Sequence, residues 1–315
     1  MLRYRQTPQL RKLLAETKLN KSDFIFPLFV HESSREKKLI KKMPGVYQHS
    51  LASLLPEVER VAKLGVESVI LFGIPSEKDE QGSKAYASDG VVQKSIAMIK
   101  KNFPEIVLIA DCCLCEYTSN GHCGIMCEGH LDNDKTLESL QKVAISYAEK
   151  GVDIVAPSGM MDGMVQAIRQ ALDQARYPMI PIMSYAAKFA SQFYGPFREA
   201  SSDDIFIGDR KHHQIQPSQK REALREALLD IDESADYLIV KPGLPYLDII
   251  QTLRQETLLP IVAYQVSGEY STLKYAADNG LIDEQEAFKE TLICLKRAGA
   301  DLIITYYADR IVSLI

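Results

Sequence analysis

The chain has 315 residues, of which 46% are hydrophobic and 25% are charged, and its formal net charge at pH 7 is −5. These values are typical of globular proteins and argue against disordered, fibrous and membrane-embedded classes. Basic residues form one short block, at 35–42, so the sequence also argues against a nucleic-acid partner.

The first 23 residues precede the first predicted strand and contain Pro8 and a short amphipathic stretch at 9–16. We expect residues 1–23 to form an N-terminal arm that packs on another subunit, and residues 24–315 to form a single domain. The start, MLRYR, is followed by polar sequence, and no run of about 18 apolar residues occurs. The expectation is therefore a cytoplasmic protein without membrane association.

Eight apolar runs rich in β-branched residues follow, each with room for a helix before the next. They lie at 24–30, 66–73, 106–112, 152–157, 179–184, 237–241, 260–266 and 300–306. Nearly continuous apolar runs suit parallel strands that are buried on both faces. The alternation favours a closed (β/α)8 TIM barrel over an open doubly wound sheet, and no G-x-G-x-x-G motif follows any predicted strand.

Helical periodicity of apolar residues appears at 54–64, 135–150 and 283–298. A glycine follows each of these segments, and a strand begins shortly after it, in KLGVESVIL, EKGVDIVAP and RAGADLIIT. Asn133 or Asp134 is expected to cap the second helix.

Five of the six cysteines fall between Cys112 and Cys127, beginning at the end of the third predicted strand. Such clustering in a cytoplasmic chain indicates metal or redox chemistry. Alternation along a strand would point Cys113 and Cys115 to one side and Cys112 to the other, so we select Cys113, Cys115 and Cys123 as zinc ligands. The alternatives are ordinary buried thiols, or a four-ligand structural site that uses Cys127 or His122.

Two lysines lie at predicted strand ends. Lys241 closes the apolar strand LIVK, and Lys188 lies just past the fifth strand among small and apolar neighbours. Desolvation lowers the pKa of a lysine, and two ammonium groups in one barrel mouth would disfavour each other's protonation. One free amine near neutral pH would then be available as a nucleophile toward a carbonyl.

Polar groups that could bind carboxylates occur near the same predicted face. Ser267 follows the seventh strand and Tyr306 ends the eighth, while the segment 197–220 contains Arg198, Arg210 and Gln214. A lid with guanidinium groups would bind a carboxylate and exclude water.

These motifs resemble the 5-aminolevulinate dehydratase (porphobilinogen synthase) family, in its zinc-dependent form. The resemblance is carried by DCCLCEYTSNGHCG at 111–124, MSYAAKFAS at 183–191, VKPGLPYLD at 240–248 and VSGEY at 266–270, and it runs from DFIFPLFV at 23–30 to Tyr306 and Tyr307. It implies a hydro-lyase that condenses two 5-aminolevulinate molecules into porphobilinogen, an early step of tetrapyrrole and haem biosynthesis.

The resemblance also implies a role for each candidate residue. Lys241 would form a Schiff base with the first substrate, whose carboxylate Ser267 and Tyr306 would hold. Lys188 would form the second Schiff base, with Arg198, Arg210 and Gln214 at that substrate's carboxylate. Zinc on Cys113, Cys115 and Cys123 would act as a Lewis acid, and Asp111, a plausible proton carrier, and Ser158 would line the site. The family further implies a homo-octamer and, in many members, an allosteric Mg²⁺ near Glu226.

The chain departs from the family pattern after the fourth strand, where it reads APSGMMDGM at 156–164 and the family usually reads APSDMMDGR. Gly159 and Met164 thus replace a carboxylate and a guanidinium, and His213 stands where a tyrosine is expected. Two competing hypotheses are a Schiff-base aldolase, which needs one lysine and no thiolate zinc, and a non-catalytic barrel stabilised by zinc.

Overall fold

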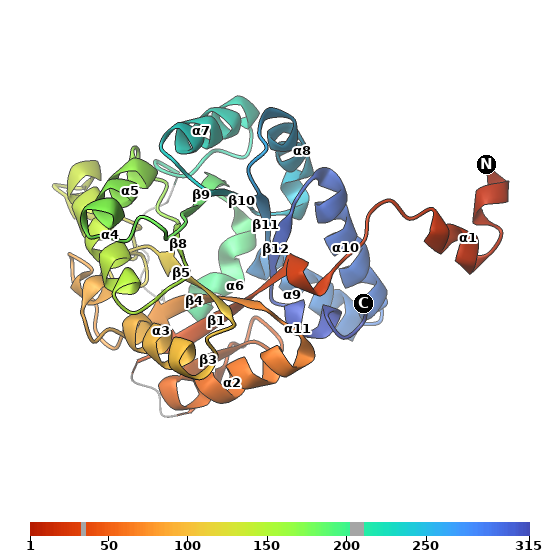
Figure 1. The fold of residues 1–315 in the computed structure, drawn as a ribbon, viewed down its shortest axis with the longest axis horizontal. Coiled ribbons are helices and arrows are strands. Elements are labelled where there is room, and N and C mark those ends of the chain that lie inside the picture. Colours follow the sequence, from red (N-terminus) through yellow and green to blue (C-terminus); the bar gives the residue numbers. More distant parts are fainter. Residues whose placement is uncertain (33–35, 202–210) are drawn as a thin grey trace.

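The computed structural model describes residues 1–32, 36–201 and 211–315, and its centre is a barrel of parallel strands (Figure 1). The barrel strands are β1 (Phe24–His31), β4 (Ser68–Ile74), β5 (Val107–Cys112), β8 (Ile154–Pro157), β9 (Met183–Lys188), β10 (Tyr237–Lys241), β11 (Ile261–Gln265) and β12 (Leu302–Thr305). Their order is β8-β5-β4-β1-β12-β11-β10-β9, and a parallel bridge between Val155 and Ile182 joins the two ends. The predicted TIM barrel is confirmed.

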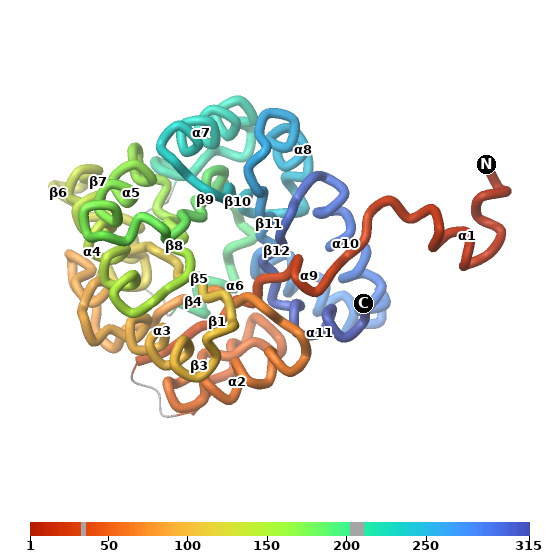
Figure 2. The backbone as a smooth tube through the Cα atoms, viewed as in Figure 1, coloured from red at the N-terminus to blue at the C-terminus, as the bar shows by residue number. Residues whose placement is uncertain are grey.

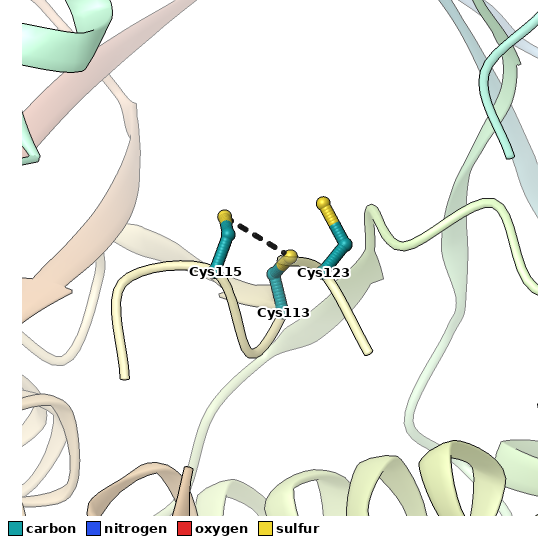
Figure 3. A group of neighbouring side chains, drawn as sticks. All are labelled: Cys113, Cys115 and Cys123. Atoms are coloured by element: carbon teal, nitrogen blue, oxygen red, sulfur yellow. Dashed lines mark hydrogen bonds between the residues drawn. The ribbon is translucent and has the colours of Figure 1, made fainter. Parts of the chain in front are cut away.

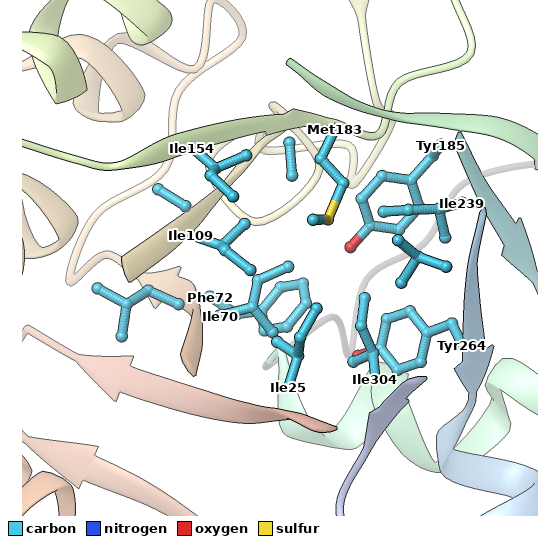
Figure 4. Close-up of a cluster of buried hydrophobic side chains, with 14 of the residues drawn as sticks. Ile25, Ile70, Phe72, Ile109, Ile154, Met183, Tyr185, Ile239, Tyr264 and Ile304 are labelled. Atoms are coloured by element: carbon cyan, nitrogen blue, oxygen red, sulfur yellow. The ribbon is translucent and has the colours of Figure 1, made fainter. Parts of the chain in front are cut away.

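The barrel forms from these residues because each strand has apolar side chains on both faces. One set fills the interior, where Ile25, Ile70, Ile109, Met183 and Ile304 from different strands meet (Figure 4). The other set packs against the surrounding helices. One helix of the β/α repeat precedes each following barrel strand: α2 (Leu51–Leu64), α3 (Val91–Asn102), α4 (Asn133–Ala148), α5 (Met164–Gln174), α7 (Lys220–Asp232), α8 (Leu247–Glu256) and α10 (Glu284–Ala298).

Additional elements lie outside this repeat. Helices α6 (Gly195–Ala200), α9 (Ser267–Asp278) and α11 (Ala308–Ile311) follow strands β9, β11 and β12 along the chain. The short strands β2 (Lys38–Leu39) and β3 (Tyr47–Ser50) extend the sheet beside β1, and β6 (Ile125–Cys127) pairs with β7 (His130–Asp132) in a separate hairpin. No helix in the described part of the chain is long and apolar enough to cross a membrane.

Several predicted element boundaries shift by a few residues, and two of these corrections have a clear physical cause. Helix α4 is capped by Asp132, whose carboxylate accepts a hydrogen bond from the Lys135 amide at 3.1 Å, so the cap lies one residue before Asn133, the earlier of the two predicted caps. Strand β9 covers Met183–Lys188 and not 179–184, because Pro178 and Pro181 lack the amide donors that a central strand needs. Lys188 is therefore the last residue of its strand.

Residues ahead of β1 extend away from the barrel, and they include the short helix α1 (Pro8–Leu13) (Figure 2). Most large apolar side chains of this segment are exposed, among them Leu2, Tyr4, Leu13 and Leu14. Exposed apolar side chains on a projecting segment are typical of a surface that another chain covers.

Candidate active site

Lys188 and Lys241 end two neighbouring strands and lie side by side. The two residues are paired in the ladder between β9 and β10, and their exposed fractions are only 4% and 7%. Both line one cavity, together with Phe72, Asp111, Cys115, Glu116, Ser158, Tyr194, Phe197 and Arg198. The structure thus brings the two predicted amines into a single buried site.

An irregularity in β9 contributes to this placement. Ser184 pairs with Leu238, but Ala187 pairs with Val240, so β9 contains one more residue than β10 over the same length. This extra residue is a β-bulge, a feature that re-aims side chains near many active sites.

Lys241 is held in an environment that disfavours its ammonium form. Burial, followed by the positive charge of Lys188, lowers the pKa of Lys241 to about 8, against the opposing charges of Asp111, Cys115 and Glu116. About a tenth of the Lys241 side chains are then free amines at pH 7, far more than for an exposed lysine. A nucleophilic amine is available without a separate base.

Asp111 provides an acid with a pKa in a useful range. Burial raises the pKa of Asp111 to about 6, although the charges of Lys241 and Lys188 oppose the rise. Its Oδ2 accepts a hydrogen bond from the Ser158 hydroxyl at 3.2 Å, and Lys188 Nζ donates to the Ser158 carbonyl oxygen at 2.5 Å. Asp111 thus bonds to the Ser158 hydroxyl and Lys188 to the Ser158 backbone carbonyl, so one residue holds both side chains beside each other.

The thiols of Cys113, Cys115 and Cys123 converge beside these side chains (Figure 3). Their sulfur atoms all lie within 4.8 Å of one another, and those of Cys113 and Cys115 are 3.3 Å apart. Cys112 points elsewhere, with its sulfur 3.7 Å from the Leu140 carbonyl oxygen. Cys127 is exposed and lies outside the group.

The reason given for this grouping from the sequence needs revision. The strand ends at Cys112, so Cys113 and Cys115 lie in the turn that follows and not in a strand with alternating side chains. Backbone amides of Tyr117 and Thr118 both donate to the Leu114 carbonyl oxygen at 2.9 Å, which folds this turn. The turn, rather than strand alternation, brings the sulfurs together.

The chemistry of the three thiols fits a soft divalent cation. The Cys113 and Cys123 thiols and burial raise the pKa of Cys115 well above its ordinary value. Three buried thiolates would repel one another unless a cation neutralised them, and thiolate sulfur prefers zinc to Mg²⁺. Three protein ligands would leave one coordination position open, as in catalytic zinc sites.

The remaining predicted residues take up distinct places. The Ser267 hydroxyl accepts a hydrogen bond from the Phe197 amide at 3.0 Å, and the hydroxyls of Tyr306 and Tyr264 are 3.0 Å apart. Gln214 is buried and adjoins Ile215, whose amide donates to the Lys188 carbonyl oxygen at 3.1 Å. Arg198 lines the cavity, and Arg210 lies outside the described residues.

Glu226 lies on α7, away from the residues that line the cavity. Burial and the charges of Asp162 and Glu222 raise the pKa of Glu226. Clustered carboxylates of this kind repel one another, and a divalent cation would relieve the repulsion.

At the two positions that depart from the family pattern, the surroundings are apolar. A Cβ atom at Gly159 would lie 3.5 Å from the Met161 side chain and 3.6 Å from Met164 Sδ, which are ordinary contact distances. Met164 is buried at the start of α5. Methionine packing therefore occupies the space beside Ser158 where the resemblance led us to expect a carboxylate and a guanidinium.

The sequence did not single out Glu116 or most of the aromatic residues of the cavity. Glu116 is 97% buried and its carboxylate accepts a hydrogen bond from the Cys115 thiol at 3.0 Å. Tyr185, Tyr194, Phe197 and Tyr264 surround Lys241. The position of Glu116 directly after a predicted ligand was a usable signal, whereas buried aromatic residues are too common to be one.

Comparisons with known proteins agree with this site. A family model described as delta-aminolevulinic acid dehydratase matches residues 1–314. The chain is 53% identical over 306 residues to the delta-aminolevulinic acid dehydratase of Bacillus subtilis, covering 97% of this chain and 94% of that protein. It is 52% identical over 302 residues to the protein of that name from Archaeoglobus fulgidus, covering 96% and 94%.

A solved structure is also closely similar. It is the delta-aminolevulinic acid dehydratase (porphobilinogen synthase) of Toxoplasma gondii in complex with the reaction product porphobilinogen. The TM-score is 0.97 at 42% sequence identity, and the match covers 99% of this chain and 90% of the other.

Proposed function

The chain belongs to the delta-aminolevulinic acid dehydratase family, and we propose that Lys188, Lys241 and the three clustered cysteines carry out the family's reaction. The enzyme is a lyase that condenses two molecules of 5-aminolevulinate into porphobilinogen with loss of two waters, a step of haem biosynthesis. The observation that carries the proposed mechanism is the pairing of two buried lysines in one cavity beside three thiols.

Lys241 starts the proposed reaction because burial and the charge of Lys188 keep part of its side chains as free amines near neutral pH. The free amine attacks the ketone carbon of the first substrate, and the resulting carbinolamine takes up a proton and loses water to leave an iminium. The rings of Phe197 and Tyr264 lie close to the Lys241 amine. Ser267 bonds to the Phe197 amide and Tyr306 pairs with the Tyr264 hydroxyl, so Ser267 and Tyr306 are near enough to bind the substrate's carboxylate. Covalent capture fixes the substrate's position and lowers the entropy cost of the later condensation.

Lys188 captures the second substrate in the same way. Arg198, together with Arg210 and Gln214, binds the second carboxylate, and Gln214 is positioned for this by the pairing of Ile215 with the end of β9. Asp111, which Ser158 holds beside Lys188, exchanges protons directly with the second substrate.

Cys113, Cys115 and Cys123 would hold zinc, which when bound supplies a Lewis acid beside the second substrate. The donor set supports zinc over Mg²⁺, because Mg²⁺ requires oxygen ligands. Family membership removes the support for a Schiff-base aldolase or a non-catalytic scaffold.

Borohydride trapping with 5-aminolevulinate tests the proposal. Reduction should add substrate mass to peptides that contain Lys241 or Lys188, and porphobilinogen production should stop when a chelator removes the metal and resume when Zn²⁺ is restored. Absence of the adduct from both peptides, or full activity without bound metal, would contradict the mechanism.

Three further proposals concern the state of the protein. The projecting arm, residues 1–23, supports a homo-oligomer, an octamer in the family's pattern, because its exposed Leu13 and Leu14 need a covering surface. The carboxylates around Glu226 support an allosteric Mg²⁺ there. The free thiols support a reducing, cytoplasmic location. Light scattering and Mg²⁺ titration of activity in a Glu226→Gln variant test the first two.

A further inference from the structure

Lys241 is enclosed by aromatic rings. Its Nζ lies 4.5 Å from the ring centroid of Tyr264, 5.0 Å from that of Tyr185, 5.2 Å from that of Phe197 and 5.3 Å from that of Tyr194. These residues come from β9, the segment that leads into α6, α6 itself and β11, so only the folded barrel brings them together.

The rings are held in place by contacts of their own. The Tyr194 hydroxyl donates to the Lys241 carbonyl oxygen at 3.1 Å, and the Tyr264 hydroxyl pairs with that of Tyr306. The Phe197 ring packs edge-on against Phe72, with centroids 5.5 Å apart and an interplanar angle of 81°. An enclosure fixed in this way requires little reorganisation when a charge forms inside it.

The environment of Lys188 differs. Its Nζ lies 5.7 Å from the Tyr185 ring centroid and donates to the Ser158 carbonyl oxygen. Aromatic faces attract a cation through the ring quadrupole, but they carry no net charge and accept no proton. Rings can therefore stabilise a cation at Lys241 without binding its ammonium form as tightly as a salt bridge would.

We propose that Tyr185, Tyr194, Phe197 and Tyr264 form an aromatic cage that stabilises the iminium cation formed on Lys241. The inference rests on the proposed function, since it concerns the Schiff base at this lysine. In that step the amine nitrogen bonds to the ketone carbon, the carbonyl oxygen leaves as water, and one proton is consumed when the amine starts neutral.

The cage also explains how an iminium can persist in a buried site. Burial alone penalises any cation, and it is the main cause that lowers the pKa of Lys241. The ring faces offset part of this penalty for the iminium, while their apolar edges exclude the water that would hydrolyse it. The cage residues thus contact the reacting nitrogen directly.

Fluorination of Phe197 tests the cage, because each added fluorine weakens the ring's attraction for a cation with little change in size. Phe197 is replaced by phenylalanine analogues with one, two or three ring fluorines, and the same series at Phe193 is the control. Phe193 lies four residues earlier, its side chain is 40% exposed and it does not line the cavity. The probe is 4-oxopentanoate, a keto acid that lacks the substrate's amine.

The readout is the equilibrium constant for the Lys241 adduct, from borohydride trapping and peptide mass spectrometry at two pH values. At about pH 9.5 the amine starts neutral, so three fluorines at residue 197 should lower the constant about two- to fivefold, in graded steps. At about pH 6.5 the lysine starts as an ammonium. The starting ammonium and the product iminium are then both cations inside the cage, so the effect of fluorine on the equilibrium constant should largely cancel.

The outcomes separate the two levels of the proposal. A graded loss at high pH for residue 197, with none for residue 193, supports the cage. Adduct at Lys241 that is insensitive to fluorine at residue 197 overturns the cage and leaves the Schiff-base mechanism intact. Absence of any adduct at Lys241 in the parent protein overturns the proposed mechanism, and the cage with it.

Discussion

The surroundings of Lys241 and those of Lys188 differ although the two residues are identical and directly paired. Aromatic rings enclose Lys241, whereas Lys188 contacts a backbone carbonyl and shares a hydrogen-bonded group with Asp111 and Ser158. The enzyme joins two copies of one substrate, so the difference between them must come from the protein. In the proposed mechanism, the unlike environments of the two lysines are what allow an asymmetric product to be made from two identical molecules.

The strongest test removes each lysine in turn. We expect Lys241→Ala and Lys188→Ala each to lower turnover at least about a thousandfold, because covalent capture supplies most of the positioning. Lys274→Ala is a matched control: Lys274 is equally buried, but it pairs with Glu284 at 2.6 Å outside the cavity. Porphobilinogen formation measures the effect. Near-normal turnover in either cavity variant contradicts the two-lysine mechanism.

Removal of a thiol tests the cysteine cluster that lies beside Lys188, Asp111 and Ser158. Cys123→Ala should lose tightly bound zinc and lower turnover at least about a hundredfold, because two thiolates hold zinc far more weakly than three. Cys127→Ala removes an exposed thiol nearby and should keep both properties. Metal content after dialysis against a chelator, measured with activity, checks this. Equal zinc content in the two variants would remove Cys123 from the ligand set.

Asp111→Asn should affect covalent capture of the substrate at Lys241 and overall turnover in opposite directions. The Asp111 charge raises the pKa of Lys241, so its removal should lower that pKa below about 8 and speed adduct formation at Lys241 near pH 7. Turnover should nevertheless fall about ten- to a hundredfold, because a proton carrier is lost. Borohydride trapping and steady-state rates measure the two effects. A parallel loss of both would indicate a merely structural role for Asp111.

The smallest expected effect is on pH dependence. In the proposed mechanism Lys241 reacts as a free amine, so its trapping rate should rise about tenfold per pH unit below pH 8 and level off above it. The charge of Lys188 lowers the pKa of Lys241, so in Lys188→Ala the rise should shift to higher pH. Trapping rates from pH 6 to 10 in the parent and the variant check this. An unchanged midpoint would show that the two amines do not interact.

The barrel was predictable because its strands are apolar on both faces, and the thiols and lysines because their residue types are rare at strand ends. Boundaries were less predictable: the strand at 179–184 was placed too early because prolines interrupt an otherwise apolar run. The cage escaped prediction for a physical reason. Tyr194 and Tyr264 lie 70 residues apart in the sequence, and their hydrophobic character is explained equally well by ordinary core packing.

The bulge in β9 has a consequence for how this site can vary. Met183 and Tyr185 face the barrel interior (Figure 4), so regular alternation would place Ala187 inside and Lys188 outside. The additional residue reverses that parity and turns the amine inward. Deleting one of the two alanines there would remove the bulge and bring the lysine to position 187, which regular alternation also points inward, so this part of the strand could lose a residue without turning the amine out of the site.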